Sequence, residues 1–286
     1  PNFKGSKYAA AALEKGASFA VIDDPDEAND PKIIYCEDTL KALQSLAKFH
    51  RSFYKKPLIG LTGSNGKTTT KELMFRALSK KYITHATKGN LNNHIGVPLT
   101  LLGITPQTQM TIIEMGANHV GEINELCQMA QPTHGLITNI GSAHTATFGG
   151  FEGVIRGKSE LFEYLRTSHG LPFINTEDKV LANMAKRFEE KILYPSDAMK
   201  FVAAQPMMSY ERAEVTHQTH LLGAYNYMNL AAVLAVGTYF KVEEISLLDA
   251  VNNYQSDNMR SQLLLKGSNQ ILLDAYNANP DSMRVA

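Results

Sequence analysis

The sequence predicts an α/β protein built around a mostly parallel sheet, and three observations support this prediction. From Lys56 onward, apolar runs of strand length alternate with segments of helical periodicity, an order typical of parallel strands joined by helices. The apolar run at 57–61 leads into the glycine-rich stretch GSNGKTT, after which a helical pattern begins at Lys67. The chain has 286 residues, of which 44% are hydrophobic, so it is long enough to form two domains with buried cores.

Composition and charge exclude several classes of protein. The formal net charge is zero, so no basic surface predicts binding to nucleic acid. Cys36 and Cys127 are too few for a disulfide framework and lack the spacing of metal ligands. No apolar run approaches the roughly 20 residues that span a bilayer, and no signal peptide is visible, so we expect a cytoplasmic protein without a membrane span. The chain begins at Pro1 without a Met, and we expect both of its ends to be cut from a longer protein.

Residues 1–54 form a small first unit. A short helix is expected at 8–15, followed by two strands at 19–22 and 33–35. Apolar residues at helical spacing predict a second helix over 39–54. These elements are too few for a complete domain, so we interpret them as the C-terminal part of an N-terminal α/β domain.

Residues 55–257 carry the strand–helix alternation and form the expected central domain. Because ligands of such sheets bind outside the carboxyl ends of the strands, the loops that follow the strands should hold the chemistry. A strand pair at 261–274 begins a further unit, which we assign to 258–286. The predicted strands lie at 57–61, 82–86, 110–114, 135–139 and 171–175, and the predicted helices at 67–80, 120–130, 151–166, 179–190, 226–240 and 243–252.

The GSNGKTT stretch has the composition of a phosphate-binding loop. Glycines let the backbone turn so that its N–H groups point inward, and the helix N-terminus adds partial positive charge. Lys67 can reach the terminal phosphates of a nucleotide, and the Thr68 hydroxyl can bind Mg²⁺. The loop is shorter than the general GxxxxGK[ST] pattern, and a glycine turn without a ligand is the alternative. The residues predicted to bind the nucleotide here are Gly63, Ser64, Asn65, Gly66, Lys67, Thr68 and Thr69.

Two later segments are expected at the same edge of the sheet. The strand at 110–114 ends in Glu114, and a carboxylate beside a phosphate loop commonly serves Mg²⁺. The next strand leads into TNIGSAH, a loop that ends at His144, although a single histidine is more often structural than functional. Together with the glycine loop, Glu114 predicts a combined nucleotide and metal site.

Lys158 occupies an unexpected position in the helix predicted at 151–166. Helical spacing places it in the middle of an apolar face that includes Val154, Leu161 and Leu165. One interpretation is that the stem is buried while the ammonium reaches water, as long side chains often arrange. The alternative is a lysine whose charge is removed by chemistry, because a buried ammonium loses its hydration.

Asparagines elsewhere suit contacts to a nucleotide or a sugar. Asn90, Asn92 and Asn93 lie in a stretch that fits either a solvent loop or hydrogen bonds to a polar sugar-nucleotide. Asn226 and Asn229 share one face near a helix start, and helix capping explains one of them better than both.

Motifs along nearly the whole chain resemble those of the Mur ligases, the ATP-dependent amino-acid ligases of bacterial cell-wall synthesis. The similar stretches are GSNGKTT, EMGAN from Glu114, TNIGSAH, GKSELF around Lys158, and DAYNANPDSM from Asp274. The resemblance implies a central P-loop ATPase domain, a preceding domain for a UDP-linked substrate, and a Rossmann-like C-terminal domain that would continue after Ala286. The last motif is most similar to the members that join D-alanyl-D-alanine to UDP-N-acetylmuramoyl-tripeptide, and we expect a monomer.

The resemblance also implies roles for single residues. It makes Glu114 a magnesium ligand, places His144 beside the metal and the reacting phosphate, and predicts that CO₂ carbamylates Lys158, which then helps to hold a second Mg²⁺. Lys67, His144 and Lys158 are thus expected to be catalytic. An acidic residue often follows this histidine in related ligases, whereas TAT follows it here, so a helper carboxylate at that point is not expected. The implied substrate contacts are Asn90, Asn92 and Asn93, and the implied ATP contacts are Asn226 and Asn229 at the adenine, Arg260 at a phosphate and Asp274 at the ribose.

The implied reaction is amide formation driven by ATP through an acyl phosphate, with Lys67 and two Mg²⁺ ions offsetting charge on the moving phosphoryl group. Two alternatives stay open, namely another ligase of the Mur or folylpolyglutamate type and a non-catalytic nucleotide-binding protein of the same fold. The shortened loop and the lack of an NKxD guanine motif count against a plain P-loop kinase or GTPase.

Overall fold

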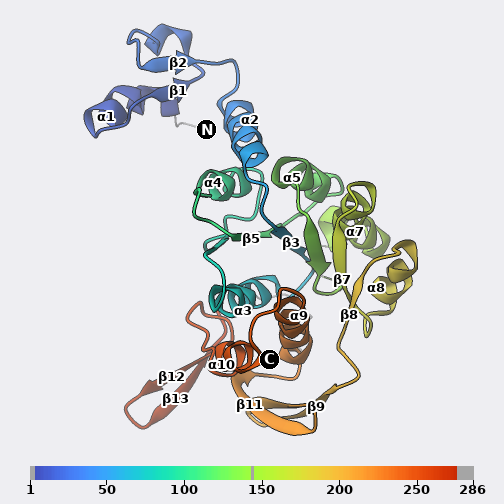
Figure 1. Ribbon diagram of the computed structural model, residues 1–286. Coiled ribbons are helices and arrows are strands. Elements are labelled where there is room, and N and C mark those ends of the chain that lie inside the picture. The colour runs from blue at the N-terminus through green and yellow to red at the C-terminus, as the bar shows by residue number, and fades with distance from the viewer. Residues whose placement is uncertain (1–3, 143–144, 276–286) are drawn as a thin grey trace.

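The computed structural model describes residues 4–142 and 145–275, and a six-stranded parallel sheet lies at its centre (Figure 1). The strands follow the order β4-β5-β3-β6-β7-β8, so β3, the first strand of the alternation, lies inside the sheet. This arrangement confirms the predicted α/β class and the parallel sheet. The strands are β3 (Leu58–Thr62), β4 (Thr84–Ala86), β5 (Met110–Glu114), β6 (His134–Ile137), β7 (Leu171–Asn175) and β8 (Ile192–Tyr194).

Helices cover both faces of the sheet because successive side chains of a strand point to opposite faces and both faces are apolar. Ile59 and Leu61 of β3 belong to one buried cluster, whereas Leu58 belongs to the other. The first cluster includes residues of α3 (Lys67–Ser79), α9 (Asn226–Tyr239) and α10 (Glu244–Asn252). The second includes residues of α2 (Thr39–Phe53), α4 (Gly96–Leu102), α5 (Glu122–Ala130), α7 (Phe151–Thr167) and α8 (Lys179–Met184).

The part of the chain before α2, residues 4–38, lies beyond that helix, away from the sheet (Figure 1). Its helix α1 (Ala9–Glu14) precedes a parallel pair formed by β1 (Ala20–Ile22) and β2 (Ile33–Tyr35). Helix α2 itself packs against α4 and α5, and its Ala47 is fully buried in the second cluster. The proposed domain boundaries after residues 54 and 257 stay predictions. Two short 3-10 helices in this unit lie at Gly5–Tyr8 and Pro25–Glu27.

Two antiparallel units complete the described fold. A small sheet of order β11-β10-β9 contains β9 (Met199–Ala204), β10 (Met207–Arg212) and β11 (Val215–Leu222), and none of these strands was predicted. Its residues Met208, Tyr210 and Leu221 are buried in the same cluster as α9 and α10. The predicted strand pair is confirmed as a hairpin of β12 (Gln262–Lys266) and β13 (Asn269–Leu273), which projects from the body of the molecule (Figure 1).

The helix predicted at 179–190 is too long. Helix α8 ends at Met184, because a 3-10 turn (Ala185–Arg187) follows and Phe188 takes an extended backbone. This conformation packs the ring of Phe188 edge-on against Phe162, with ring centroids 5.8 Å apart. Helix α4 and the short α6 (Thr145–Phe148) lie where no helix was predicted.

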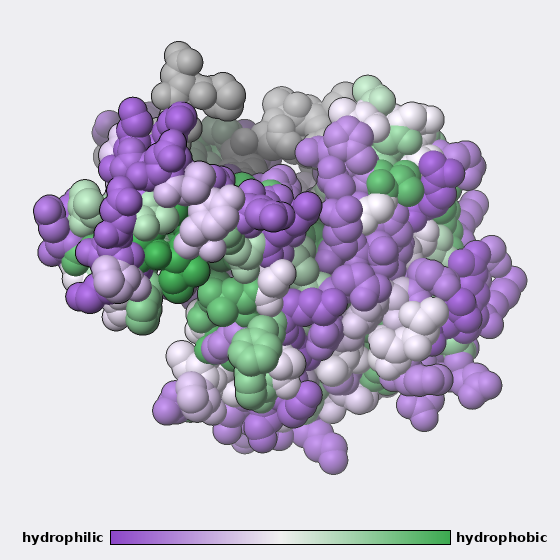
Figure 2. Space-filling model, turned by 90° about the horizontal axis from the view of Figure 1, so that it is seen from above, coloured by the Kyte–Doolittle hydropathy of each residue, from purple (hydrophilic) through white to green (hydrophobic). Residues whose placement is uncertain are grey.

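The surface is mixed in character. Seen from the end that carries the first unit, hydrophobic residues form small groups among hydrophilic ones (Figure 2). Phe19, Phe49 and Phe53 are each more than half exposed. None of the helices in the described ranges combines the length and the apolar character needed to cross a bilayer.

Candidate nucleotide site

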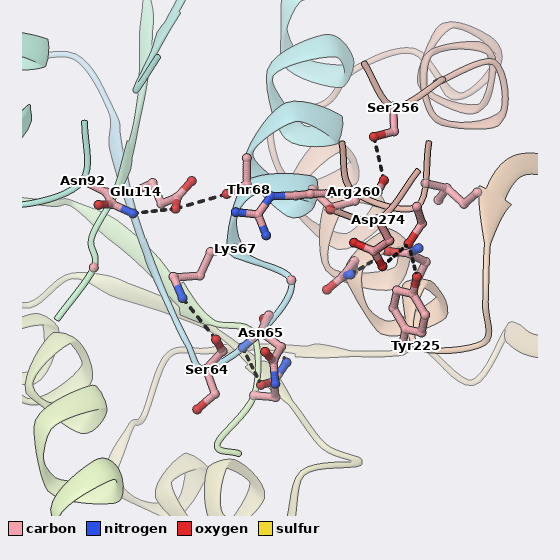
Figure 3. A pocket seen from close by; sticks show the side chains of 18 of the residues that line it. Ser64, Asn65, Lys67, Thr68, Asn92, Glu114, Tyr225, Ser256, Arg260 and Asp274 are labelled. Carbon is pink, nitrogen blue, oxygen red and sulfur yellow. Dashed lines mark hydrogen bonds between the residues drawn. The ribbon is translucent and has the colours of Figure 1, made fainter. Parts of the chain in front are cut away.

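A cavity of about 600 Å³ opens at the carboxyl ends of the central strands (Figure 3). In the strand order, the connection from β3 to β4 runs toward one edge of the sheet, whereas the connection from β6 to β7 runs toward the opposite edge. Such a reversal between neighbouring strands leaves a crevice in which α/β proteins bind ligands. The cavity is lined by the loop after β3, the end of β5, the start of α9 and the segment after α10.

The glycines of the GSNGKTT loop are required by its geometry. Gly63 has φ of +144° and Gly66 has φ of +78°, a region that side chains rarely allow. A Cβ atom on Gly63 would lie 1.9 Å from Thr138 Oγ1, and one on Gly66 would lie 2.3 Å from Asn229 Oδ1. The loop therefore approaches both β6 and α9 as closely as its backbone permits. Gly66 lines the cavity, whereas Gly63 is buried and is not among the lining residues.

The loop that follows β6 holds the glycine loop in place. Thr138 Oγ1 donates to the carbonyl of Asn65 at 2.6 Å, and Asn139 Nδ2 donates to the same oxygen at 3.0 Å. Asn139 Oδ1 accepts from the N–H of Asn65 at 3.1 Å, and Ser64 Oγ donates to the carbonyl of Gly141 at 3.1 Å. Asn139 also lines the cavity, although the sequence analysis did not select it. The available signal was its position directly after a strand at the predicted edge.

Lys67 is the first residue of α3 and reaches back over the loop. Its Nζ donates to the carbonyl oxygens of Gly63 at 2.7 Å and Ser64 at 3.2 Å. Burial lowers the pKa of Lys67, while Glu114 raises it and Arg260 lowers it. Two cations, Lys67 and Arg260, therefore act on the same part of the cavity, an arrangement that favours an anionic ligand.

Glu114 at the end of β5 is buried and incompletely satisfied. Its Oε1 accepts from Thr68 Oγ1 at 3.3 Å and from Asn92 Nδ2 at 2.9 Å. Among the described residues, its Oε2 has no hydrogen-bond partner, and the nearest ion pair is with Lys71 Nζ at 4.0 Å. A buried carboxylate oxygen without a partner is costly, and a bound cation would satisfy it.

The donors at this point fit Mg²⁺ in a nucleotide complex. The described residues contain no group of three or more His, Cys, Asp or Glu placed to hold an ion. A site made of the Thr68 hydroxyl, the Glu114 carboxylate, phosphate oxygens and water is typical of Mg²⁺ bound together with a nucleotide. His144, the remaining predicted metal residue, lies outside the described residues.

Lys158 is buried inside the second cluster, with 1% of its surface exposed. Its Nζ donates to the carbonyl of Ala117 at 3.3 Å and lies 5.3 Å from the ring centroid of Phe148. The interpretation in which the ammonium reaches water is therefore wrong. Burial lowers the pKa of Lys158 to about 7, with a further lowering by Lys67 that nearby Glu122 and Glu160 oppose. Because Ala117 lines the cavity, Lys158 lies directly behind its wall.

The three predicted substrate asparagines have different positions. Asn92 donates to Glu114, and Asn93 Oδ1 accepts from the N–H of Gly96 at 2.9 Å, at the start of α4. Both line the cavity next to His94, which was not predicted. Asn90 is exposed and is not among the lining residues.

The far end of the cavity brings together residues from three segments. Asn229 Nδ2 donates to Asn226 Oδ1 at 2.8 Å, and Asn229 Oδ1 accepts from Thr70 Oγ1 at 3.1 Å. Ser261 Oγ donates to Asp274 Oδ2 at 3.3 Å and also bonds the Tyr225 hydroxyl. Arg260 extends into the cavity toward Thr68 (Figure 3). Predicted nucleotide residues that are distant in sequence therefore line one cavity; they are Ser64, Asn65, Gly66, Lys67, Thr68, Thr69, Asn226, Asn229, Arg260 and Asp274.

Comparison with known proteins gives relatives along the whole chain. A family described as the Mur ligase middle domain matches residues 61–237. The UDP-N-acetylmuramoyl-tripeptide–D-alanyl-D-alanine ligase of Bacillus subtilis is 36% identical over 99% of this chain, and the Escherichia coli protein of the same name is 32% identical over 99%. A crystal structure of MurF from Acinetobacter baumannii has a TM-score of 0.84 and 29% identity over 100% of this chain. The chain spans 64%, 66% and 65% of the lengths of these three proteins.

Proposed function

Because this chain belongs to the Mur ligase family, we propose that the protein carrying it is an ATP-dependent ligase that joins D-alanyl-D-alanine to UDP-N-acetylmuramoyl-tripeptide. The observation that carries the proposal is the cavity in which the glycine loop, the partly unsatisfied Glu114 and the cation Arg260 converge. Phosphate loop, acid and arginine together suit phosphoryl transfer from a nucleoside triphosphate. The names of the relatives support the choice of substrates.

The proposed reaction has two steps. A carboxylate oxygen of the tripeptide attacks the γ-phosphorus of ATP, the bond to the β-phosphate breaks, and an acyl phosphate forms. The amine of the dipeptide then attacks the acyl carbon, inorganic phosphate leaves, and the amine proton passes to solvent. Lys67 and Arg260 bind and orient the phosphates, and the backbone of the glycine loop surrounds them. Mg²⁺, held by Thr68 and Glu114, would offset negative charge on the phosphate oxygens.

We assign the two substrates to different sides of the cavity and a separate role to each part of the chain. Asn92 and Asn93 lie on the side that we assign to the UDP-linked substrate, and Asn226, Asn229 and Asp274 on the side of the nucleoside. We further propose a substrate unit at 1–54, an ATP-binding unit at 55–257 and the beginning of a C-terminal unit at 258–286. We place the reaction in the cytoplasm, with a monomeric enzyme.

Carbamylation of Lys158 is part of the proposal. Only a neutral amine attacks CO₂, and burial that lowers the pKa to about 7 makes the neutral form abundant at physiological pH. The new N–C bond releases one proton and gives an anion next to the cavity wall, where it would help to hold a second Mg²⁺. With ¹³C-bicarbonate, the wild-type chain should give a carbamate carbon signal that the Lys158→Arg variant lacks. Lys191→Arg serves as the control, and an equal signal in all three proteins would refute the carbamate.

The test of the reaction uses the whole natural protein that carries this sequence. We expect phosphate release from ATP only when UDP-N-acetylmuramoyl-tripeptide and D-alanyl-D-alanine are both present, and mass spectrometry should detect the joined product. Turnover with another amino acid in place of the dipeptide would favour a different Mur or folylpolyglutamate-type ligase. Nucleotide binding without turnover on any acceptor would favour a non-catalytic protein.

A further inference from the structure

A single carboxylate of α3 holds both ends of the segment that leads from α10 into the cavity. The Tyr254 hydroxyl donates to Glu72 Oε2 at 2.6 Å, and Asn258 Nδ2 donates to the same oxygen at 2.7 Å. Tyr254 is buried, and Arg76 of α3 lies over its ring, 5.2 Å from the centroid. The path of the chain from Tyr254 to Asn258 is therefore set by α3, the helix that begins at the phosphate loop.

Ser256 extends this network from Asn258 to Arg260. Ser256 Oγ lies within donating distance of two acceptors, Asn258 Oδ1 at 2.9 Å and the backbone oxygen of Arg260 at 2.7 Å. Met259 has φ of +59° and Ser261 has φ of +46°, so left-handed non-glycine residues flank Arg260 on both sides. Such conformations are costly for residues with a Cβ and persist where surrounding contacts enforce them. The bonds of Ser261 to Tyr225 and Asp274 hold this stretch on its C-terminal side. On its N-terminal side, Ser256 holds the Arg260 carbonyl, and Glu72 holds Asn258.

A buried lysine, Lys71, connects Glu72 to Glu114, the carboxylate that would bind Mg²⁺. Lys71 is buried, and its Nζ lies 3.8 Å from Glu72 Oε1 and 4.0 Å from Glu114 Oε2. One buried ammonium thus stands between the carboxylate that holds the Arg260 segment and the carboxylate that faces the phosphate loop. A neutral amide at position 72 would leave Lys71 with one anion fewer. It would also weaken the hydrogen bonds from Tyr254 and Asn258, because hydrogen bonds to charged groups are stronger than those to neutral ones.

We propose that Glu72 is a positioning residue that holds Arg260 over the phosphate loop. It touches no ligand itself; it fixes Tyr254 and Asn258, and through Ser256 it fixes the backbone that presents the guanidinium. The inference rests on the proposed function in one respect, which is that Arg260 meets the phosphates of ATP. A residue that merely stabilised α3 would not act through Arg260.

The first test is a double-mutant cycle on the affinity of the chain for ATP in the presence of Mg²⁺, measured by calorimetry. Glu72→Ala and Arg260→Ala should each weaken binding by about tenfold or more. The double variant should bind about as weakly as Arg260→Ala alone, because Glu72 acts through that residue. Additive losses would overturn the inference. Asp249→Asn is the control, since it removes the charge from a surface bond between α3 and α10, Lys80 Nζ to Asp249 Oδ2 at 2.8 Å, outside this network.

The second test needs no nucleotide. Hydrogen exchange of the amides at 256–261 should be faster by about tenfold in Glu72→Ala, whereas the amides of α3 should keep their rates. Glu72→Gln, which retains one acceptor oxygen, should lie between this variant and the wild type, and Asp249→Asn should match the wild type. Unchanged exchange at 256–261 in Glu72→Ala would also overturn the inference. Failure of the whole natural protein to bind ATP would refute the proposed function, while the exchange experiment would still decide the role of Glu72.

Discussion

At the scale of single residues, Lys158 combines a buried position with a group that can carry charge. Its pKa is lowered from 10.5 to about 7 in the folded chain, chiefly by burial. Between these two values the unfolded chain binds one proton more than the folded chain, so the stability of the wild type rises with pH across this window. Below about 7 both states are protonated, and the burial of the ammonium costs its full amount.

The stability of Lys158→Met should therefore lack this pH dependence, so its advantage over the wild type should be largest at low pH. In buffers free of CO₂ the variant should be more stable by several kcal/mol at pH 6, since each pKa unit corresponds to about 1.4 kcal/mol. The difference should shrink steadily toward pH 9. Urea unfolding at four pH values measures it, and a difference that stays constant with pH would show that Lys158 is not buried as a titrating group.

Lys67→Ala should weaken ATP binding while leaving the stability of the fold nearly unchanged. The loss of a half-buried cation from the phosphate loop should weaken ATP binding by about a hundredfold, because charge-assisted contacts to phosphate are strong. The thermal midpoint should change little, since α3 still begins at the same residue and alanine favours helix. Calorimetry and thermal unfolding are the measurements. Lys191→Ala removes a comparable bond, from Lys191 Nζ to the carbonyl of Phe188 at 2.8 Å, and should leave ATP binding unchanged.

At the scale of elements, Arg51 joins the end of α2 to the end of α5. Its Nε donates to the carbonyl of Ala130 at 2.8 Å, Nη2 donates to Gln131 at 2.9 Å, and Nη1 donates to Tyr54. The planar fork of a guanidinium reaches all three oxygens, which the single ammonium of lysine cannot do. This side chain therefore links the C-terminal end of α2 to the end of α5.

Arg51→Lys should lower the free energy of unfolding by about 2–3 kcal/mol while ATP affinity stays within twofold, because two or more buried carbonyls lose their donor and the cavity is untouched. Urea unfolding and calorimetry measure the two effects. Arg166→Lys on the surface of α7 is the matched control, where the exposed pair with Glu163 contributes little. Equal losses in the two variants would contradict the role assigned to Arg51.

Helices whose apolar residues recur at helical spacing, and strands that form a continuous apolar run, could be predicted from the sequence. The run predicted at 57–61 corresponds to β3, which is apolar because the sheet is buried on both sides. The predicted apolar stripe at 151–166 corresponds to the buried face of α7. Helix α4 was missed because Gly96 and Pro98 are typical turn residues. In the structure both lie in its first turn, where the missing N–H of proline costs no helical bond. β9 was missed because its apolar run at 201–204 has only four residues and does not alternate with polar ones, so its periodicity does not separate strand from helix.

In the candidate site, too, some residues could be predicted from local sequence patterns and others could not. The glycine loop, Glu114 and the asparagine pair are recognisable because each is a local pattern at the end of a strand or the start of a helix. Glu72 carries no such pattern, because its role depends on Asn258, a residue that comes 186 positions later in the chain. Contacts across such separations follow from the strand order and the packing of α10, which no local periodicity encodes.

At the scale of the whole molecule, α2 is the last helix of the unit proposed at 1–54, yet it packs against the central layers. Gln44 Nε2 donates to the carbonyl of His94 at 3.0 Å, and His50 Nε2 lies 2.9 Å from the carbonyl of Ile104. Both contacts join α2 to the segment around α4. The strands β1 and β2 pair only with each other among the described residues, so they depend less on the sheet.

A fragment of residues 36–275 should therefore keep the thermal stability of the sheet, whereas a fragment of residues 55–275 should lose it. We expect the shorter fragment to unfold at least about 5 °C lower, because removal of α2 exposes the apolar surface that Ala47 covers. Differential scanning calorimetry of the two fragments decides this. Equal midpoints would show that the stability of the sheet does not depend on α2.

The long separations within the cavity also bear on when the site exists during synthesis. Thr70 meets Asn229 across 159 residues, and Glu72 meets Asn258 across 186. A ribosome that adds about 5–20 residues per second needs roughly 10–40 s to make that length of chain. During this interval the glycine loop has left the ribosome while its partners on α9 and beyond α10 have not yet been made. The complete site can form only when these late segments arrive, so a nucleotide that uses all of its contacts would stabilise finished chains more than those still being made.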